Sequence, residues 1–96
     1  MTVFLTRRAE KNYQFIKDYL SEEWGTHVAQ AFEQRTIDLL DLLSNFPDLG
    51  PVELPEKQIH GFQLTKQIRI FYRLKANRII ILSFFDVRQD PRKKPQ

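Results

Sequence analysis

The 96-residue sequence contains no cysteine, and other scarce residue types narrow the possible functions further. Without cysteine the chain cannot form disulfides, use a thiol nucleophile or hold zinc through cysteine. Its only two histidines, His27 and His60, are far apart in the sequence, so neither a metal site nor a cofactor is predicted. The longest aliphatic run, 79–82, is far shorter than the ~20 residues of a membrane-spanning helix, and no signal peptide is recognisable. We therefore expect a cytoplasmic protein without a membrane partner.

Charge is distributed unevenly along the chain. Residues 1–55 carry five Lys/Arg and nine Asp/Glu, a net charge of −4, whereas residues 56–96 carry ten and three, a net charge of +7. A basic C-terminal half suits a polyanionic partner, which would be nucleic acid, the ribosome or an acidic protein segment. A merely solubilising surface would account for the same charges.

Length and apolar pattern predict a single domain, residues 1–96, of the α+β class. An apolar content of 42% in 96 residues can bury one core. A short β-prone segment, Thr2 to Leu5, is followed by Thr6, whose side chain can cap a helix that begins directly after it. Gly25 separates this amphipathic helix from a second one, predicted over about 27–44.

The second half of the chain predicts a sheet. Residues 47–56 contain three prolines and are predicted to be a surface connection. Beyond them the apolar period changes from about 3.6 to 2, which predicts strands over 59–65, 67–75 and 78–86. We therefore expect the order β-α-α-β-β-β, with an α-helical hairpin packed on one face of a small antiparallel sheet that the N-terminal strand joins at an edge.

A two-residue turn at Ala76-Asn77 would set the register of the last two strands, with Tyr72 opposite Ile81 and Arg69 opposite Phe84. One face would then carry the apolar residues that suit a core under the helices: Ile68, Ile70, Tyr72, Leu74, Ile79, Ile81 and Phe85. The opposite face would combine guanidinium groups with an apolar strip: Arg69, Phe71, Arg73, Ile80, Leu82 and Phe84. Such a face can bind an amphipathic partner segment or hold RNA, unless the C-terminal tail or a second copy of the chain covers it.

Short motifs follow one another along nearly the whole chain: Leu5-Thr6-x-x-Ala9, Glu22-Glu23-Trp24-Gly25, Phe46-Pro47-x-Leu49-Gly50, Arg69-x-x-Tyr72-Arg73, Ile79-Ile80-Ile81-Leu82 and Asp86-x-Arg88-Gln89-x-Pro91. In this order and spacing they resemble the RelE/ParE superfamily of toxins from type II toxin–antitoxin systems, often called plasmid stabilisation proteins. The resemblance implies a growth-inhibiting toxin that a cognate antitoxin neutralises by wrapping an extended, partly helical segment around it.

The resemblance leaves the target and the enzymatic status open. RelE-like members cleave messenger RNA in the ribosomal decoding site, whereas ParE-like members bind DNA gyrase and cleave nothing. Arg69 and Arg88 match the positions of catalytic arginines in RelE-like toxins, but the C-terminal run 92–95 offers no tyrosine or histidine as a base. The gyrase hypothesis needs no base and is slightly favoured. A family member that only binds its antitoxin is a third alternative.

The surface predicted to bind the target or the antitoxin consists of the outer face of the sheet together with basic residues expected near it. Arginine can pair acidic residues or phosphates, and the apolar strip can anchor a partner. A homodimer and a hetero-oligomer with the antitoxin are both compatible with such a surface. Its predicted residues are Lys66, Arg69, Phe71, Arg73, Ile80, Leu82, Phe84, Arg88 and Arg92.

Overall fold

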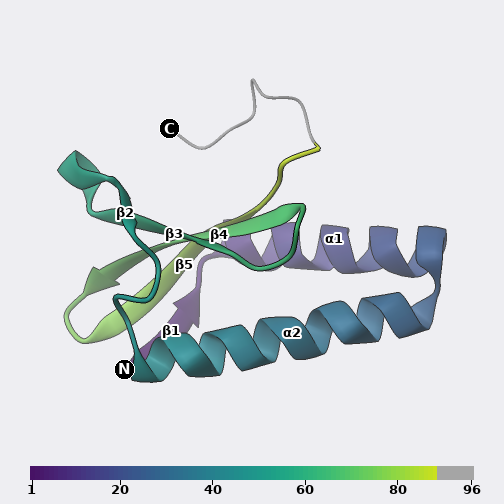
Figure 1. Cartoon of the computed structure of the whole chain (residues 1–96), viewed down its shortest axis with the longest axis horizontal. Coiled ribbons are helices and arrows are strands. Elements are labelled where there is room, and N and C mark those ends of the chain that lie inside the picture. Colours follow the sequence, from purple (N-terminus) through teal and green to yellow (C-terminus); the bar gives the residue numbers. More distant parts are fainter. Residues whose placement is uncertain (89–96) are drawn as a thin grey trace.

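The computed structural model describes residues 1–88, in which two helices cover one face of a five-stranded sheet (Figure 1). The strand order is β1-β5-β4-β3-β2; β1 runs parallel to β5, and the other neighbours are antiparallel. In chain order the elements are β1 (Thr2–Leu5), α1 (Arg7–Trp24), α2 (Thr26–Asn45), β2 (Val52–Leu54), a 3-10 turn (Pro55–Lys57), β3 (Ile59–Gln63), β4 (Ile68–Lys75) and β5 (Arg78–Asp86).

The predicted α+β class and the order of the predicted elements are confirmed. Two details were wrong. The sheet is mixed rather than antiparallel, because β1 pairs in parallel with β5. Residues 47–56 are also more than a connection, since Val52–Leu54 forms the edge strand β2 beside β3. An extended Val-Glu-Leu segment between two prolines can pair on one side only, which is the position of an edge strand.

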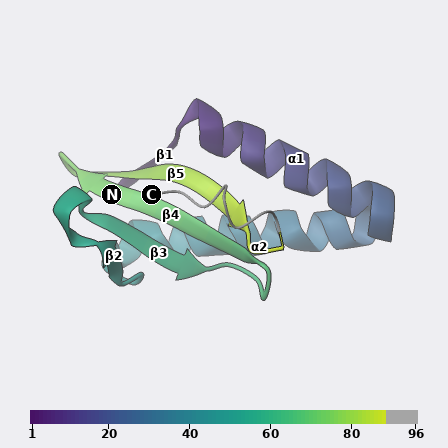
Figure 2. The ribbon, with the colours of Figure 1, turned by 90° about the horizontal axis from the view of Figure 1, so that it is seen from above.

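The two helices form a hairpin whose closed end extends beyond the strands (Figures 1 and 2). Thr6 caps α1, because its Oγ1 accepts a hydrogen bond from the backbone N of Ala9 at 3.1 Å. Gly25, at φ 95°, ends α1 and directly precedes α2, a backbone conformation that glycine adopts without a steric penalty. Within residues 1–88, neither helix is long and apolar enough to cross a membrane.

The core lies between the hairpin and the inner face of β4 and β5. Tyr13 on α1 connects the layers, since its ring stacks on Phe32 of α2 at 5.4 Å and lies 5.6 Å from Phe84 of β5. Removing these apolar groups from water is the main stabilising contribution to such a fold. The buried cluster contains Ala9, Ile16, Phe32, Leu39 and Leu43 from the helices, and Leu64, Ile68, Ile70, Tyr72, Ile79, Ile81 and Phe84 from the sheet side.

A β-bulge in β5 changes which side chains face the helices. Tyr72 lies opposite Ile81, as predicted, but Phe71 lies opposite Ser83, so Leu82 has no partner residue on β4. One extra residue reverses the alternation of every later side chain. The predicted positions of two phenylalanines were therefore wrong: Phe84 is buried in the core, and Phe85 faces outward beside Phe71, with 6.5 Å between ring centroids.

Side chains of α1 and its cap satisfy backbone groups at the bulge. The Thr6 hydroxyl donates to the Leu82 carbonyl at 3.1 Å, and the Phe84 backbone N donates to Asn12 Oδ1 at 3.2 Å. Buried backbone groups without partners would cost stability, and a bulge disrupts the ladder that normally pairs them. The start of α1 and the bulge thus stabilise each other.

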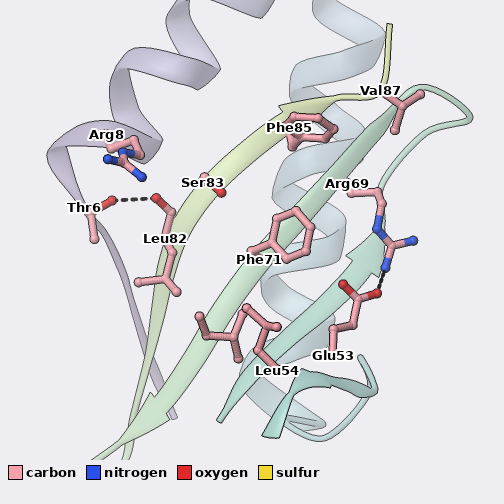
Figure 3. Close-up of a pocket in the computed structure, with 11 residues that line it drawn as sticks. Thr6, Arg8, Glu53, Leu54, Arg69, Phe71, Leu82, Ser83, Phe85 and Val87 are labelled. Atoms are coloured by element: carbon pink, nitrogen blue, oxygen red, sulfur yellow. Dashed lines mark hydrogen bonds and ion pairs between the residues drawn. The ribbon is translucent and has the colours of Figure 1, made fainter. Parts of the chain in front are cut away.

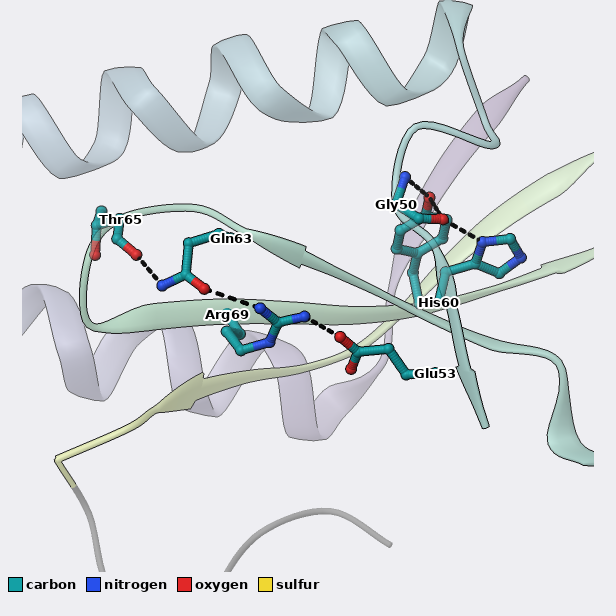
Figure 4. A network of polar contacts seen from close by, with 7 residues as sticks. Gly50, Glu53, His60, Gln63, Thr65 and Arg69 are labelled. Atoms are coloured by element: carbon teal, nitrogen blue, oxygen red, sulfur yellow. Dashed lines mark hydrogen bonds and ion pairs between the residues drawn. The ribbon is translucent and has the colours of Figure 1, made fainter. Parts of the chain in front are cut away.

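A buried polar cluster ties the segment after α2 to the sheet, and part of it is visible in Figure 4. The Tyr72 hydroxyl donates to the Pro47 carbonyl at 2.8 Å and accepts from the Gly50 backbone N at 2.9 Å. His60 stacks on Tyr72 at 4.9 Å between centroids, and its Nδ1 lies 2.7 Å from the Gly50 carbonyl oxygen. Burial raises the pKa of Tyr72 above its usual 10.0. The cluster gives both His60 and Tyr72 a structural role.

Candidate docking site on the outer face of the sheet

The outer face of the sheet, turned away from the helices, contains a pocket of about 600 Å³ (Figure 3). Strands β4 and β5 form its floor, the start of α1 lies on one side, and β2 lies on the other. A concave, mainly apolar surface with a few polar groups is typical of a binding site. The pocket is lined by Thr6, Arg8, Glu53, Leu54, Ile59, Arg69, Phe71, Leu82, Ser83, Phe85 and Val87.

Arg69 lies at the β2 side of this pocket and is already neutralised there. Its guanidinium forms an ion pair with Glu53 and donates to Gln63 Oε1 at 2.9 Å (Figure 4). It also lies 5.9 Å from the centroid of the Phe71 ring. Glu53 reaches Arg69 from β2 across β3, and Gly61 makes this possible: a Cβ there would lie 2.4 Å from the Glu53 carboxyl carbon. Arg69 is therefore held in place by contacts within the chain.

The α1 side of the pocket has the opposite character. Arg8 lines the pocket and forms no ion pair within residues 1–88. It belongs to the first turn of α1, where the helix dipole adds partial positive charge. An anionic group of a partner is therefore favoured at this end.

Ser83, on the floor, is the one buried side chain in the described part of the chain with an unpaired polar atom. Only 6% of the residue is exposed, and its Oγ has no hydrogen-bond partner. The bulge places Ser83 on the outer face opposite Phe71, so the hydroxyl lies among apolar neighbours (Figure 3). Buried hydroxyl groups in proteins nearly always have partners, which makes this one notable.

The structure separates the predicted docking residues into several locations. Arg69, Phe71 and Leu82 line the outer pocket. Arg73 and Ile80 lie opposite each other on β4 and β5, on the outer face of the sheet, but neither lines the pocket. The predicted exposure of Phe84 was wrong, because the bulge turns its side chain into the core, where it is 3% exposed. Lys66 is exposed in the connection between β3 and β4, and the predicted Arg92 lies outside the described residues.

Arg88 lies on the helix side of the sheet rather than with Arg69. It lines a second pocket, of about 730 Å³, together with Trp24, Val28 and Ile68. Its guanidinium binds the Asp86 carboxylate at 3.0 and 2.8 Å and lies 5.7 Å from the centroid of the Tyr19 ring. Burial alone would raise the pKa of Asp86, but the hydrogen bonds and charge of Arg88 lower it below its usual 3.8. The two predicted catalytic arginines thus line different pockets.

Several pocket residues were not predicted from the sequence: Thr6, Arg8, Glu53, Leu54, Ile59, Ser83, Phe85 and Val87. Some were detectable. The alternating triplet Val52–Leu54 between Pro51 and Pro55 is compatible with an edge strand whose central residue, Glu53, faces one side. Ser83 and Phe85 required knowledge of the bulge, which regular alternation does not indicate.

Comparison with known proteins identifies the class to which this fold and surface belong. Residues 3–91 match the family described as "ParE toxin of type II toxin-antitoxin system, parDE". The chain belongs to this family, so it is the toxin component of a type II toxin–antitoxin system, and its partner is an antitoxin. No curated protein sequence matches the chain.

Solved structures show the same fold. A structure titled "Chromosomal ParDE TA system from P. aeruginosa" is similar with a TM-score of 0.76 and 23% identity, over 91% of this chain and 96% of that one. A YoeB/ParE toxin from Agrobacterium tumefaciens is similar with a TM-score of 0.66 and 15% identity, over 90% and 98%. A YoeB-YefM complex from Staphylococcus aureus has a chain with a TM-score of 0.61 and 13% identity, over 88% and 94%.

Proposed function

We propose that this toxin inhibits growth in the cytoplasm by binding a macromolecular target such as DNA gyrase, without catalysing a reaction, until its cognate antitoxin neutralises it. The observation that carries the proposal is the position of the two candidate catalytic arginines. Arg69 lies in the outer pocket and Arg88 in the pocket on the helix side, and each is paired with a carboxylate of the same chain.

Metal-free RNA cleavage requires a base, an acid and cations that converge on one phosphate. Arg69 and Arg88 do not line a common pocket in which both could contact one phosphate. His60 is buried against Tyr72, lines neither pocket and contacts the Gly50 carbonyl, so its position does not suit a general base. Glu53 adds a negative charge beside Arg69, which disfavours a phosphate there. These features support binding rather than cleavage.

The RelE-like alternative has one supporting observation. The Arg69 guanidinium lies over the Phe71 ring on the open face of the sheet, and a cation beside an aromatic ring can hold a phosphate and a stacked base. If Glu53 moved away on binding, Arg69 would become available. Glu53→Gln tests this directly, because it removes the carboxylate's charge and keeps its size.

The decisive experiment combines expression of the toxin alone with two assays on the purified protein. We expect growth arrest, inhibition of gyrase supercoiling, and no cleavage of messenger RNA in a ribosome-dependent translation system. Arg69→Ala and Glu53→Gln should leave transcripts equally intact. Ribosome-dependent cleavage that a folded Arg69→Ala variant loses would refute the proposal in favour of the nuclease. Normal growth with folded toxin that still binds antitoxin would refute it in favour of a member that only binds its partner.

A further inference from the structure

We propose that two copies of the free toxin associate through their helical hairpins, with the tip of each hairpin inserted in the helix-side pocket of the other. The tip consists of Glu22, Glu23 and Trp24, the last residues of α1. The inference goes beyond the proposed function, because it depends neither on the target nor on the mode of inhibition.

The hairpin and the end of the sheet form an inside corner. The closed end of the hairpin extends beyond the strands, so part of its inner side lies past the end of the sheet (Figures 1 and 2). The helix-side pocket, of about 730 Å³, occupies this corner, and its lining includes Trp24 and Val28 from the hairpin and Thr65, Gln67 and Arg88 from the sheet side. A molecule of this shape can pair with a second copy so that the overhanging part of each hairpin lies beneath the other.

The hairpin side of the pocket leaves apolar side chains in contact with water. Trp24 is 66% exposed and Val28 is 40% exposed, and both line the pocket. Exposed apolar groups around a hollow mark interaction surfaces, and tryptophan is among the commonest anchor residues in protein interfaces. A second copy would remove both Trp24 rings from water, because each ring would enter the pocket of the other copy.

The spacing of residues along α2 suits a two-fold arrangement. Val28, Ala31 and Arg35 lie on one stripe of the helix, at positions i, i+3 and i+7, and all three line the pocket. In a two-fold interface the same surface of each copy meets itself. If two α2 helices cross antiparallel at Ala31, its small side chain allows a close approach, and each Val28 lies on the same side of the crossing as the partner's Arg35.

Opposite charges then meet on both sides of the crossing. Lys17 and Glu33, eight residues before and after the glycine of the hairpin, form an ion pair, so residues equidistant from that glycine lie side by side. Glu23 therefore lies about as far before Ala31 along the hairpin as Arg35 lies after it. In an antiparallel crossing the acidic tip of one copy reaches the partner's Arg35.

These charged groups are available in the free toxin. Glu22, Glu23 and Arg35 are exposed and form no ion pair within residues 1–88. The Arg35 Nε donates to the Leu64 carbonyl, which positions the guanidinium, and a guanidinium can bind a carboxylate and also lie over an indole ring. An acidic tip disfavours a nucleic acid as the occupant of the corner, whereas a second copy offers an acidic tip for each arginine.

The first test compares two exposed aromatic residues of α1 by sedimentation equilibrium of the free toxin. The toxin is purified as the co-expressed complex, separated from its antitoxin in guanidinium and refolded. We expect a reversible dimer that Trp24→Ala weakens about 30-fold or more, because aromatic anchors dominate interface energies. Phe15→Ala is the matched control, since Phe15 is 64% exposed but does not line the pocket, and it should leave dimerisation unchanged.

The second test reverses the charges on both sides of the contact. Replacing Glu22 and Glu23 together by lysine, or Arg35→Glu alone, should weaken dimerisation about 10-fold or more, because each dimer contains the contact twice. The variant that combines all three substitutions should regain most of the affinity. Arg35→Glu also removes the hydrogen bond to Leu64, but the combined variant lacks it too, so the recovery reports charge pairing. Arg7→Glu, at the opposite end of α1, is the charge control and should have no effect.

Three results would overturn the inference. The first is a folded wild-type toxin that stays monomeric up to about 100 µM, since a specific interface should bind more tightly than this. The second is a dimer that persists in both Trp24→Ala and the charge reversals, because another surface would then join the copies. The third is a combined charge variant that remains as weak as its parents. Gyrase and transcript assays do not enter this test, so the proposed function is judged separately.

Discussion

Replacing Tyr72 by phenylalanine should destabilise the toxin substantially, because one hydroxyl holds the segment after α2 against the sheet. Tyr72 is 0% exposed, and its hydroxyl bonds the Pro47 carbonyl and the Gly50 backbone N. Each of the two hydrogen bonds contributes about 1 kcal/mol net to the free energy of unfolding. Without the hydroxyl, the buried Gly50 backbone N–H is left unpaired, which adds to the loss, whereas the carbonyl of the half-buried Pro47 can bind water instead. We expect a loss of about 2 kcal/mol, which lowers the melting temperature of a domain of this size by about 8–16 °C.

Urea unfolding at pH 7 measures this loss as a lower midpoint with an unchanged slope. Tyr19→Phe is the matched control, because Tyr19 is 40% exposed and its hydroxyl forms no hydrogen bond in the described part of the chain. Burial raises the pKa of Tyr72, so its contribution is complete below pH 10.0 and is lost as the pH rises toward the higher folded value. The Tyr72→Phe variant should lack this alkaline loss. A penalty below about 0.5 kcal/mol would refute the reasoning.

Three further predictions test other contacts. Thr6→Ala should cost about 1–2 kcal/mol in urea unfolding, since it removes the α1 cap and the bond to the bulge, and Thr6→Ser should recover most of it. Gly61→Ala should displace Glu53 and destabilise the toxin, with a clearly smaller penalty in a Glu53→Ala background; equal penalties would contradict the contact. The lowered pKa of Asp86 means that its stabilisation, complete above 3.8, is lost as the pH falls toward the folded pKa. Acid unfolding of Asp86→Asn should lack this contribution; identical pH profiles would argue against it.

The helices and the register near the turn were predictable because their causes are local. Thr6 caps α1, Gly25 separates the helices, and the Ala76-Asn77 turn fixes the pairing of Tyr72 with Ile81. The bulge was not predictable in this way, because it is stabilised by contacts with residues more than 70 positions earlier, at Thr6 and Asn12. The alternation of apolar and polar residues along β5 does not indicate such distant contacts.

The candidate site was predictable only in part, for the same reason. The outer position of Arg69 and Phe71 follows from the regular alternation along β4, and both residues line the pocket. Phe84 and Phe85 lie after the bulge, so their predicted faces were exchanged. The ion pair between Arg69 and Glu53 was not expected, because it depends on an edge strand of three residues and on a glycine beneath the carboxylate.

The parallel pairing of β1 with β5 has a consequence for the synthesis of this toxin. β5 ends at residue 86, lies between β1 and β4, and supplies core residues beneath both helices. Until the ribosome has released it, the first strand has no neighbour and the apolar stripe of α1 has no sheet to cover. Formation of the sheet is thus delayed until β5 has left the ribosome. A nascent chain cut short before β5 should be inert and easily degraded, so only copies that contain β5 need an antitoxin.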